Sequence, residues 1–311
     1  MANANQPQIP LLHSNVLSKV KLLNVALDRS GCLQDLTFLY RRPSQSTQDN
    51  IGVNDSTLWL DEGQFPPVHR ESALPHRSKE PVIFTGTLGE GTVGQGLDAV
   101  VLDVTMDAQH SSAELRMMTI PPLVAKISRG GIENARRVEN DAFFYEEMES
   151  LQGIAIARYY GFFEAILPDG WVIASESWPR PEGNAEGAGV NKVAVVLLEK
   201  LGGSLHVGMD GVNLKSQLDY LYEELWALGI WHDDIRPWNI LQAPSHEGAL
   251  PGCQSNYNNQ TYEFRLIDFG LAYKTNMTKK MYMYYSALEY AKMCKDISFE
   301  ILDLGKERRD R

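Results

Sequence analysis

Two short motifs in the second half of the chain constrain it more than any other feature. Residues 232 to 239 read His-Asp-Asp-Ile-Arg-Pro-Trp-Asn, and residues 266 to 270 read Leu-Ile-Asp-Phe-Gly. An aspartate, an asparagine five residues later and the aspartate of Asp-Phe-Gly are typical of a phosphoryl-transfer site. The first accepts the proton of the attacking hydroxyl, and the other two hold metal ions. The candidates are therefore Asp234 as the base, with Asn239 and Asp268 as metal ligands.

The neighbours of Asp234 have alternative interpretations. Arg236 carries a fixed charge that suits a transferring phosphoryl group, and an ion pair with a nearby carboxylate is its other interpretation. Asp233 is expected to cap the loop or to face solvent, although the adjacent aspartates leave the choice of base ambiguous. We expect His232 to hold the loop by packing and hydrogen bonding. Trp238 is predicted to belong to the core rather than to stack on a ligand.

A glycine-rich segment and a lysine occur upstream in an order that also suits phosphate binding. A strand from Val82 enters glycines at 86, 89, 91, 94 and 96, and a second strand resumes at Ala99. A dinucleotide-binding fingerprint would need a helix after the glycines, and a P-loop would need Gly-Lys-Ser/Thr. Lys126 lies in the apolar run Leu123-Val-Ala-Lys-Ile, where a charge is costly unless it pairs with phosphate or carboxylate. Residues 131 to 150 then show helical apolar spacing.

Taken in order, these motifs resemble the eukaryotic protein-kinase-like superfamily. Segments 145–153, 160–161 and 197–203, together with the loop at 232–241, resemble more closely the divergent kinase-like proteins of filamentous fungi. The resemblance implies an α+β, two-lobed protein-kinase-like fold with a shortened C-terminal lobe. It also implies binding of ATP with Mg²⁺ or Mn²⁺.

The resemblance assigns roles to further residues. The glycine loop, with Gly89, Gly91 and Gly94, would cover the phosphates. Lys126 would bind phosphate oxygens and pair with an acid on the following helix, either Asp141 or, on the other flank of its apolar stripe, Glu139. The backbones of Glu199 and Leu201 would meet the adenine, with Leu198 as the gatekeeper.

Three departures from the family pattern leave the function open. Gly96 replaces the expected valine, a polar insertion at 107–114 lengthens the span to Lys126, and the chain after Gly270 is short and lacks Ala-Pro-Glu. The catalytic set favours an ATP-dependent phosphotransferase acting on a Ser/Thr hydroxyl of a protein. The missing peptide platform favours a small-molecule kinase of the aminoglycoside or choline type. Asp141, Gly96 and the short end favour a non-catalytic nucleotide-binding scaffold.

The pattern predicts three regions. Residues 1–80 form an N-terminal extension, with a hairpin over 16–40 whose first arm has a helix as its alternative, followed by a loosely ordered linker. Residues 81–201 form a kinase-like N-lobe, and 202–311 a truncated C-lobe.

Composition narrows the partners and the location. The 311-residue chain has a formal net charge of -11 and a pI near 5.2. Nucleic acids and anionic membranes bind basic surfaces, so this composition argues against a general affinity for either. Three separated cysteines, without histidines nearby, predict no zinc site and a reducing compartment. No signal-like segment and no run of eighteen apolar residues occurs. We therefore expect a soluble intracellular protein, cytoplasmic or nuclear, whose partners are ATP and a protein or small-molecule hydroxyl acceptor.

Overall fold

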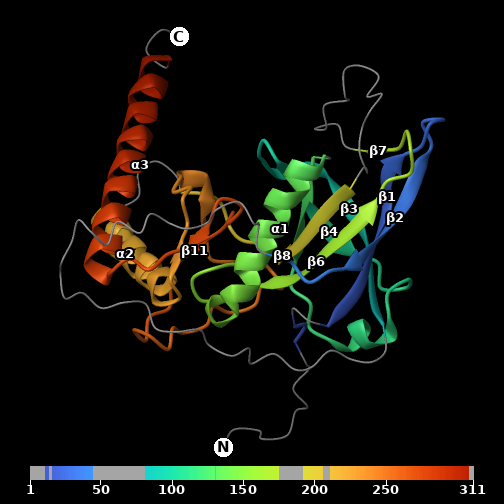
Figure 1. The fold of residues 1–311 in the computed structure, drawn as a ribbon, viewed down its shortest axis with the longest axis horizontal. Helices are drawn as coiled ribbons and strands as arrows, with labels where there is room; N and C mark the ends of the chain where they lie inside the picture. Colours follow the sequence, from blue (N-terminus) through green and yellow to red (C-terminus); the bar gives the residue numbers. More distant parts are fainter. Residues whose placement is uncertain are drawn as a thin grey trace, which may run out of the picture. The chain divides into compact units, whose positions relative to one another are not determined.

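The computed structural model describes residues 11–13, 16–44, 81–129, 131–174, 192–205 and 211–307, without the side chains of 211–213 and of residues after Met293. The chain divides into two compact units (Figure 1). The barrel unit contains the described residues up to Ser44, those from 81 to Phe143, and Arg158–Lys200. The helical unit contains Phe144–Ala157 and the described residues from Leu201 onward.

Seven strands of the barrel unit form a closed sheet. In chain order they are β1 (Leu17–Leu27), β2 (Leu33–Tyr40), β3 (Val82–Gln95), β4 (Ala99–Met106), β5 (Leu123–Ser128), β6 (Tyr159–Ile166) and β8 (Lys192–Glu199). Their order is β2-β6-β8-β5-β4-β3-β1, and β1 also pairs with β2, which closes the ring. The pairing of β1 with β3 is parallel and the other six are antiparallel. The short strand β7 (Val172–Ile173) adds to the end of β1.

Apolar side chains from every strand fill the inside of the closed sheet. Each of the seven strands contributes to one buried hydrophobic cluster, because side chains of successive strand residues point to opposite faces. Its members include Leu17, Val20, Leu22, Phe38, Phe84, Val100, Ala125, Ile127, Phe163, Val195 and Leu197. The barrel is therefore a packed core.

The expected two-lobed protein-kinase-like fold with a shortened C-terminal lobe is wrong. The structure is α+β, but it is dominated by a closed seven-stranded mixed barrel, with three α-helices among its described residues. The reason lies in the N-terminal hairpin, which was assigned to an extension. The hairpin itself is confirmed by the pairing of β1 with β2, and its arms also pair with β3 and β6. It thereby satisfies the two sheet edges that would otherwise present unpaired backbone groups. The linker predicted to follow the hairpin lies, from residue 45 to 80, outside the described residues.

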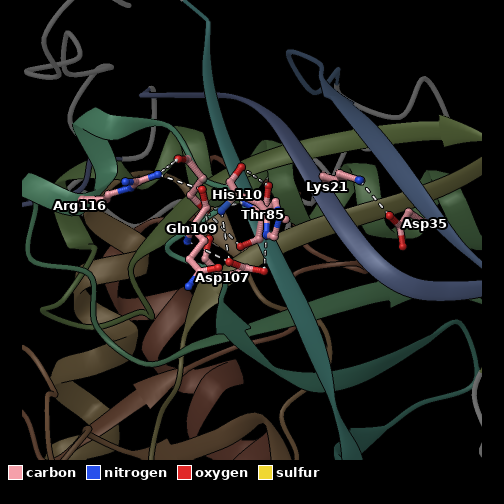
Figure 2. Close-up of polar contacts among 8 residues, drawn as sticks. Lys21, Asp35, Thr85, Asp107, Gln109, His110 and Arg116 are labelled. Atoms are coloured by element: carbon pink, nitrogen blue, oxygen red, sulfur yellow. Dashed lines mark hydrogen bonds and ion pairs between the residues drawn. The ribbon is translucent and has the colours of Figure 1, made fainter.

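Polar contacts fix the outer parts of the barrel (Figure 2). Lys21 on β1 and Asp35 on β2 form an ion pair of 2.8 Å. The polar insertion after β4 folds back onto β3, where the buried Ser111 hydroxyl accepts the Thr85 N–H at 2.9 Å. Asp107 accepts hydrogen bonds within the insertion, including one of 2.8 Å from the His110 ring. The insertion is thus an ordered part of the barrel wall.

The helical unit contains α2 (Gly211–Ala227), α3 (Lys279–Glu307) and the last turn of α1 (Ile132–Glu147). Gly229, with φ of 63°, follows α2 in the left-handed conformation that commonly ends helices. The buried stripe of α3 consists of Tyr282, Ser286, Tyr290 and Met293, and the Tyr290 ring lies 5.6 Å from that of Tyr222 on α2. Leu288, on the same helix, is exposed.

Two small sheets complete the helical unit. β10 (Ile240–Gln242) pairs with β11 (Phe264–Leu266), and β9 (Ile230–Trp231) pairs with β12 (Tyr273–Lys274), both antiparallel. No described helix is long and apolar enough to cross a membrane.

Candidate functional site

The β10–β11 pair brings the two motifs of the second half together. Ile240 faces Leu266 across the pair, so the segment before β10 meets the segment after β11. The Ile267 N–H donates to the Asn239 carbonyl at 3.0 Å. Asp268 follows with φ of 66°, a left-handed conformation that aspartate tolerates better than most residues. Asn239 is therefore bonded to Asp234 and to the backbone of Ile267, and Asp268 is the next residue of the chain.

The Asp234 carboxylate is held on both oxygens. Its Oδ2 accepts the Asn239 Nδ2 at 2.9 Å, and its Oδ1 lies 2.5 Å from the Arg236 Nε. The same Asn239 nitrogen also donates to the Asp234 carbonyl at 3.0 Å. The amide nitrogen of Asn239 is thereby committed to the loop, and its Oδ1 is the atom with the chemistry of a metal ligand.

His232 supports this loop from within. The ring is buried, its Nδ1 lies 3.2 Å from the Asp234 N–H, and its Nε2 lies 2.8 Å from the Ile267 carbonyl. A backbone N–H only donates and a carbonyl only accepts, so the ring is the neutral form protonated on Nε2. Phe269 packs edge-on against it at 4.9 Å. This geometry agrees with the expected supporting role.

Asp233, next to the proposed base, has different surroundings. Asp233 is exposed and has a φ of 58°. Its carboxylate accepts a hydrogen bond of 3.2 Å from the Trp231 Nε1. Partial burial of the carboxyl raises its pKa above the usual value. These contacts make Asp233 a capping residue of the loop.

Arg236 and Trp238 lie on the outer side of the loop. Arg236 forms the ion pair that was its alternative interpretation, and its guanidinium carbon lies 5.6 Å from the Trp238 ring centroid. Trp238 is 56% exposed, so its predicted place in the core is wrong. The reason is the short 3-10 turn Pro237–Asn239, which buries Asn239 and leaves the preceding side chain outside.

In the barrel unit, Lys126 has the acidic partner that its apolar strand requires. Its Nζ lies 2.8 Å from the Asp141 Oδ2, and the Asp141 side chain is fully buried on α1. Glu139, the alternative acid, instead accepts the Ser44 hydroxyl at 2.7 Å and lies 3.8 Å from the Lys192 Nζ. Asp141 is thus the acid that pairs with Lys126, despite its short side chain.

The glycines lie inside β3 rather than in a turn between strands. The turn to β4 comes later, where the Gly96 N–H donates to the Ala99 carbonyl at 2.9 Å. A register shift between Leu88 and Thr92 leaves Gly89 and Gly91 in a bulge. A Cβ at Gly91 would meet open space, whereas one at Gly89 would approach the Asp103 Cβ at 3.2 Å. Close packing therefore favours glycine at position 89, whereas position 91 has room for a larger side chain.

Glu199 and Leu201 have structural partners that sequence reasoning missed. The buried Glu199 carboxylate binds the Arg158 guanidinium at 2.7 Å and its N–H at 2.8 Å. The Glu199 N–H donates to the Arg158 carbonyl at 2.9 Å, so this donor is already engaged in the barrel. Leu201 is buried, at 8% exposure. A carboxylate at the end of the apolar run Val193-Ala-Val-Val-Leu-Leu-Glu199 was the sequence signal for a cationic partner such as Arg158.

Two side chains of the site carry oxygen atoms with the chemistry of metal ligands. Among the described residues, no group of three or more His, Cys, Asp or Glu side chains is placed to hold a metal ion. Mg²⁺ commonly takes one or two protein oxygens and completes its shell with phosphate and water. The Asn239 amide oxygen and the Asp268 carboxylate are donors of this type.

A scan against models of protein families finds no match, and a search of curated proteins likewise finds no match to this chain.

Proposed function

We propose that the protein is an ATP-dependent phosphotransferase that acts on a hydroxyl group, with Mg²⁺ or Mn²⁺ as its metal. The observation that carries the proposal is the β10–β11 pair, beside which Asn239 binds the Asp234 carboxylate and its carbonyl accepts the N–H of Ile267, the residue before Asp268. The favoured acceptor is a Ser or Thr hydroxyl of a protein, and the alternative is a small molecule. The proposed setting is intracellular, because the chain carries only three cysteines and these are far apart in the sequence.

The proposal gives each residue a role. Asp234 accepts the acceptor proton once one of its oxygens leaves Arg236 or Asn239. Arg236, released from the ion pair, supplies positive charge to the transferring group. Asn239 and Asp268 provide oxygen ligands for the metal, which would neutralise phosphate charge. Lys126, with its position fixed by Asp141, is proposed to bind phosphate oxygens.

A second function is favoured by one specific observation. Both oxygens of Asp234 already have partners, namely Arg236 and Asn239. A carboxylate held in this way is a weak proton acceptor until a partner moves. The alternative is therefore a protein that binds nucleotide without transferring phosphate.

Thermal unfolding with and without Mg-ATP tests nucleotide binding. A ligand that binds only the folded state raises the melting temperature by mass action, so we expect an increase at millimolar Mg-ATP. Asp268→Ala should abolish the metal-dependent part of this increase, and Lys126→Met should reduce it. Asp169→Ala is the matched control, since Asp169 lies in an exposed turn of the barrel unit.

The results separate the two functions. If Mg-ATP leaves the melting temperature of the folded wild type unchanged, both the phosphotransferase and the nucleotide-binding function are contradicted. A raised melting temperature without metal-dependent ATP hydrolysis would leave only the nucleotide-binding function. If Asp268→Ala responds to Mg-ATP like Asp169→Ala, the metal assignment is wrong.

A further inference from the structure

Trp238 has an exposed indole, whereas the other tryptophans that the structure describes in the same unit are buried. Trp226 and Trp231 in the same unit are 3% and 6% exposed, whereas Trp238 is 56% exposed. A single exposed apolar side chain is ordinary on a protein surface. Trp238 differs from such a residue in two respects: its backbone is held in a tight turn, and its ring lies next to Arg236.

The backbone under Trp238 is rigid. Pro237 fixes the start of the 3-10 turn, and the Asn239 N–H donates to the Arg236 carbonyl at 3.0 Å. Asn239 itself is 3% exposed and bonded twice to Asp234. The indole is therefore carried by a fixed turn, although its ring is in solvent.

Arg236 links this ring to the proposed base. Its guanidinium carbon lies 5.6 Å from the ring centroid, and its Nε lies 2.5 Å from the Asp234 Oδ1. The exposed aromatic ring and the carboxylate therefore contact the same side chain. Arg236 is thus the side chain that connects the exposed ring with the carboxylate of the same loop.

We infer that Trp238 determines acceptor specificity by packing against a flat apolar group directly beside the acceptor hydroxyl. The inference rests on the proposed phosphotransferase function and names the substrate class for it. Aromatic rings pack against an indole with geometric preference as well as area burial.

Two matched pairs of acceptors test the inference. One pair consists of peptides and the other of small molecules, so the results also show which kind of acceptor carries the aromatic group. The first pair is a serine peptide with Phe beside the serine and the same peptide with Ala there. The second is phenylalaninol and alaninol, which carry the same contrast on a small molecule. Wild-type protein should phosphorylate the phenyl member of at least one pair with about tenfold higher kcat/KM, the scale of one aromatic contact.

Substitutions then assign the preference to the ring. Trp238→Ala should bring both members of the pair to equal kcat/KM, and Trp238→Phe should retain most of the preference. Tyr284→Ala is the control, because Tyr284 is similarly exposed, at 55%, but lies on α3. The Mg-ATP melting shift of each variant shows that it is folded and binds nucleotide.

The outcomes distinguish the inference from the function beneath it. Equal phosphorylation of both members of each pair by wild type, or a preference that survives in Trp238→Ala, overturns the inference alone. The same holds if Mg-ATP is bound and hydrolysed but neither phenyl compound is phosphorylated. Absence of both Mg-ATP binding and hydrolysis overturns the proposed function, and the inference falls with it.

Discussion

His232 and Asp234 lie two residues apart in a loop whose side chains bind its own backbone. Few substitutions in this loop would therefore preserve its hydrogen bonds. His232 accepts the Asp234 N–H and donates to Ile267, while Asn239 binds both the carbonyl and the carboxylate of Asp234. A substitution that preserves shape is therefore needed to separate chemistry from loop damage.

Asp234→Asn keeps the shape of the side chain and removes its capacity as a proton acceptor. We expect turnover to fall by at least about a hundredfold, the lower scale of general base effects, with ATP affinity little changed. Single-turnover transfer and nucleotide titration measure the two quantities separately. Asp233→Asn is the control, because an asparagine oxygen still accepts the Trp231 N–H and asparagine tolerates φ of 58°. Equal losses from both variants would indicate a damaged loop.

Some of these residues could be predicted from sequence and others could not. Desolvation predicted that Lys126 in its apolar strand pairs with phosphate or carboxylate, and the resemblance to kinases supplied Asp141 or Glu139 as the acid. Asp234 and Asn239 could be paired from their spacing. The exposure of Trp238 could not be predicted, because its neighbours in sequence are as apolar or as constrained as those of a buried tryptophan. Only the direction of the 3-10 turn decides it.

At the scale of the element, the β1–β2 turn depends on one carboxylate. Asp28 Oδ1 accepts the Ser30 hydroxyl at 2.6 Å and the Cys32 N–H at 3.0 Å, and its Oδ2 accepts the Gln34 amide at 2.8 Å. The bond from the Ser30 hydroxyl is the largest cause that lowers the Asp28 pKa to about 2. The charged form of Asp28 is therefore preferred in the folded turn.

This pKa predicts a pH dependence of stability. Because the folded pKa lies below the unfolded value of about 3.9, the charged carboxylate stabilises the turn above about pH 4, and this contribution is lost as pH falls toward about 2. Wild type should therefore melt above Asp28→Asn at neutral pH, and the difference should shrink between about pH 4 and pH 2. Melting curves of both proteins across that range measure it. A difference independent of pH would show that the charge of Asp28 does not stabilise the turn.

Elements were more predictable than their placement. The Asp28-Arg-Ser-Gly31 sequence between two apolar arms predicted the hairpin, since its residues favour tight turns. The glycines after Val82 predicted a loop, yet they lie within β3 as a bulge. Glycine permits a turn without requiring one, so pairing with β4 decided the conformation.

At the scale of the whole molecule, barrel closure makes the N-terminal hairpin part of the core. Phe38 on β2 is fully buried, and the adjacent Leu39 is 41% exposed. Phe38→Ala should lower the free energy of unfolding by about 3 to 5 kcal/mol, the cost of emptying a buried aromatic site. Leu39→Ala should cost less than about 1 kcal/mol, since it leaves the core intact. Urea unfolding of both variants measures the contrast. Similar losses would mean that β2 does not face the core as described.

The closure itself could not be predicted from local patterns. The apolar pattern of a segment indicates that it forms a strand. It does not indicate which distant strand becomes its neighbour in the sheet. The pairing of Leu39 with Glu164, and the parallel pairing of Val20 with Phe84, depend on the complete arrangement of sheet edges. A fold assigned from motif order alone therefore left the hairpin outside the sheet it closes.

The β2–β6 pairing has a consequence for how the protein is made. Tyr40 pairs with Phe163, so β2 leaves the ribosome long before the strand that completes its hydrogen bonding. During that interval the hairpin exposes an apolar face and an open edge, the features that promote association between nascent chains. Pairings between distant segments are also slow to form once synthesis ends. Newly synthesised chains should therefore depend on chaperones until β6 is available.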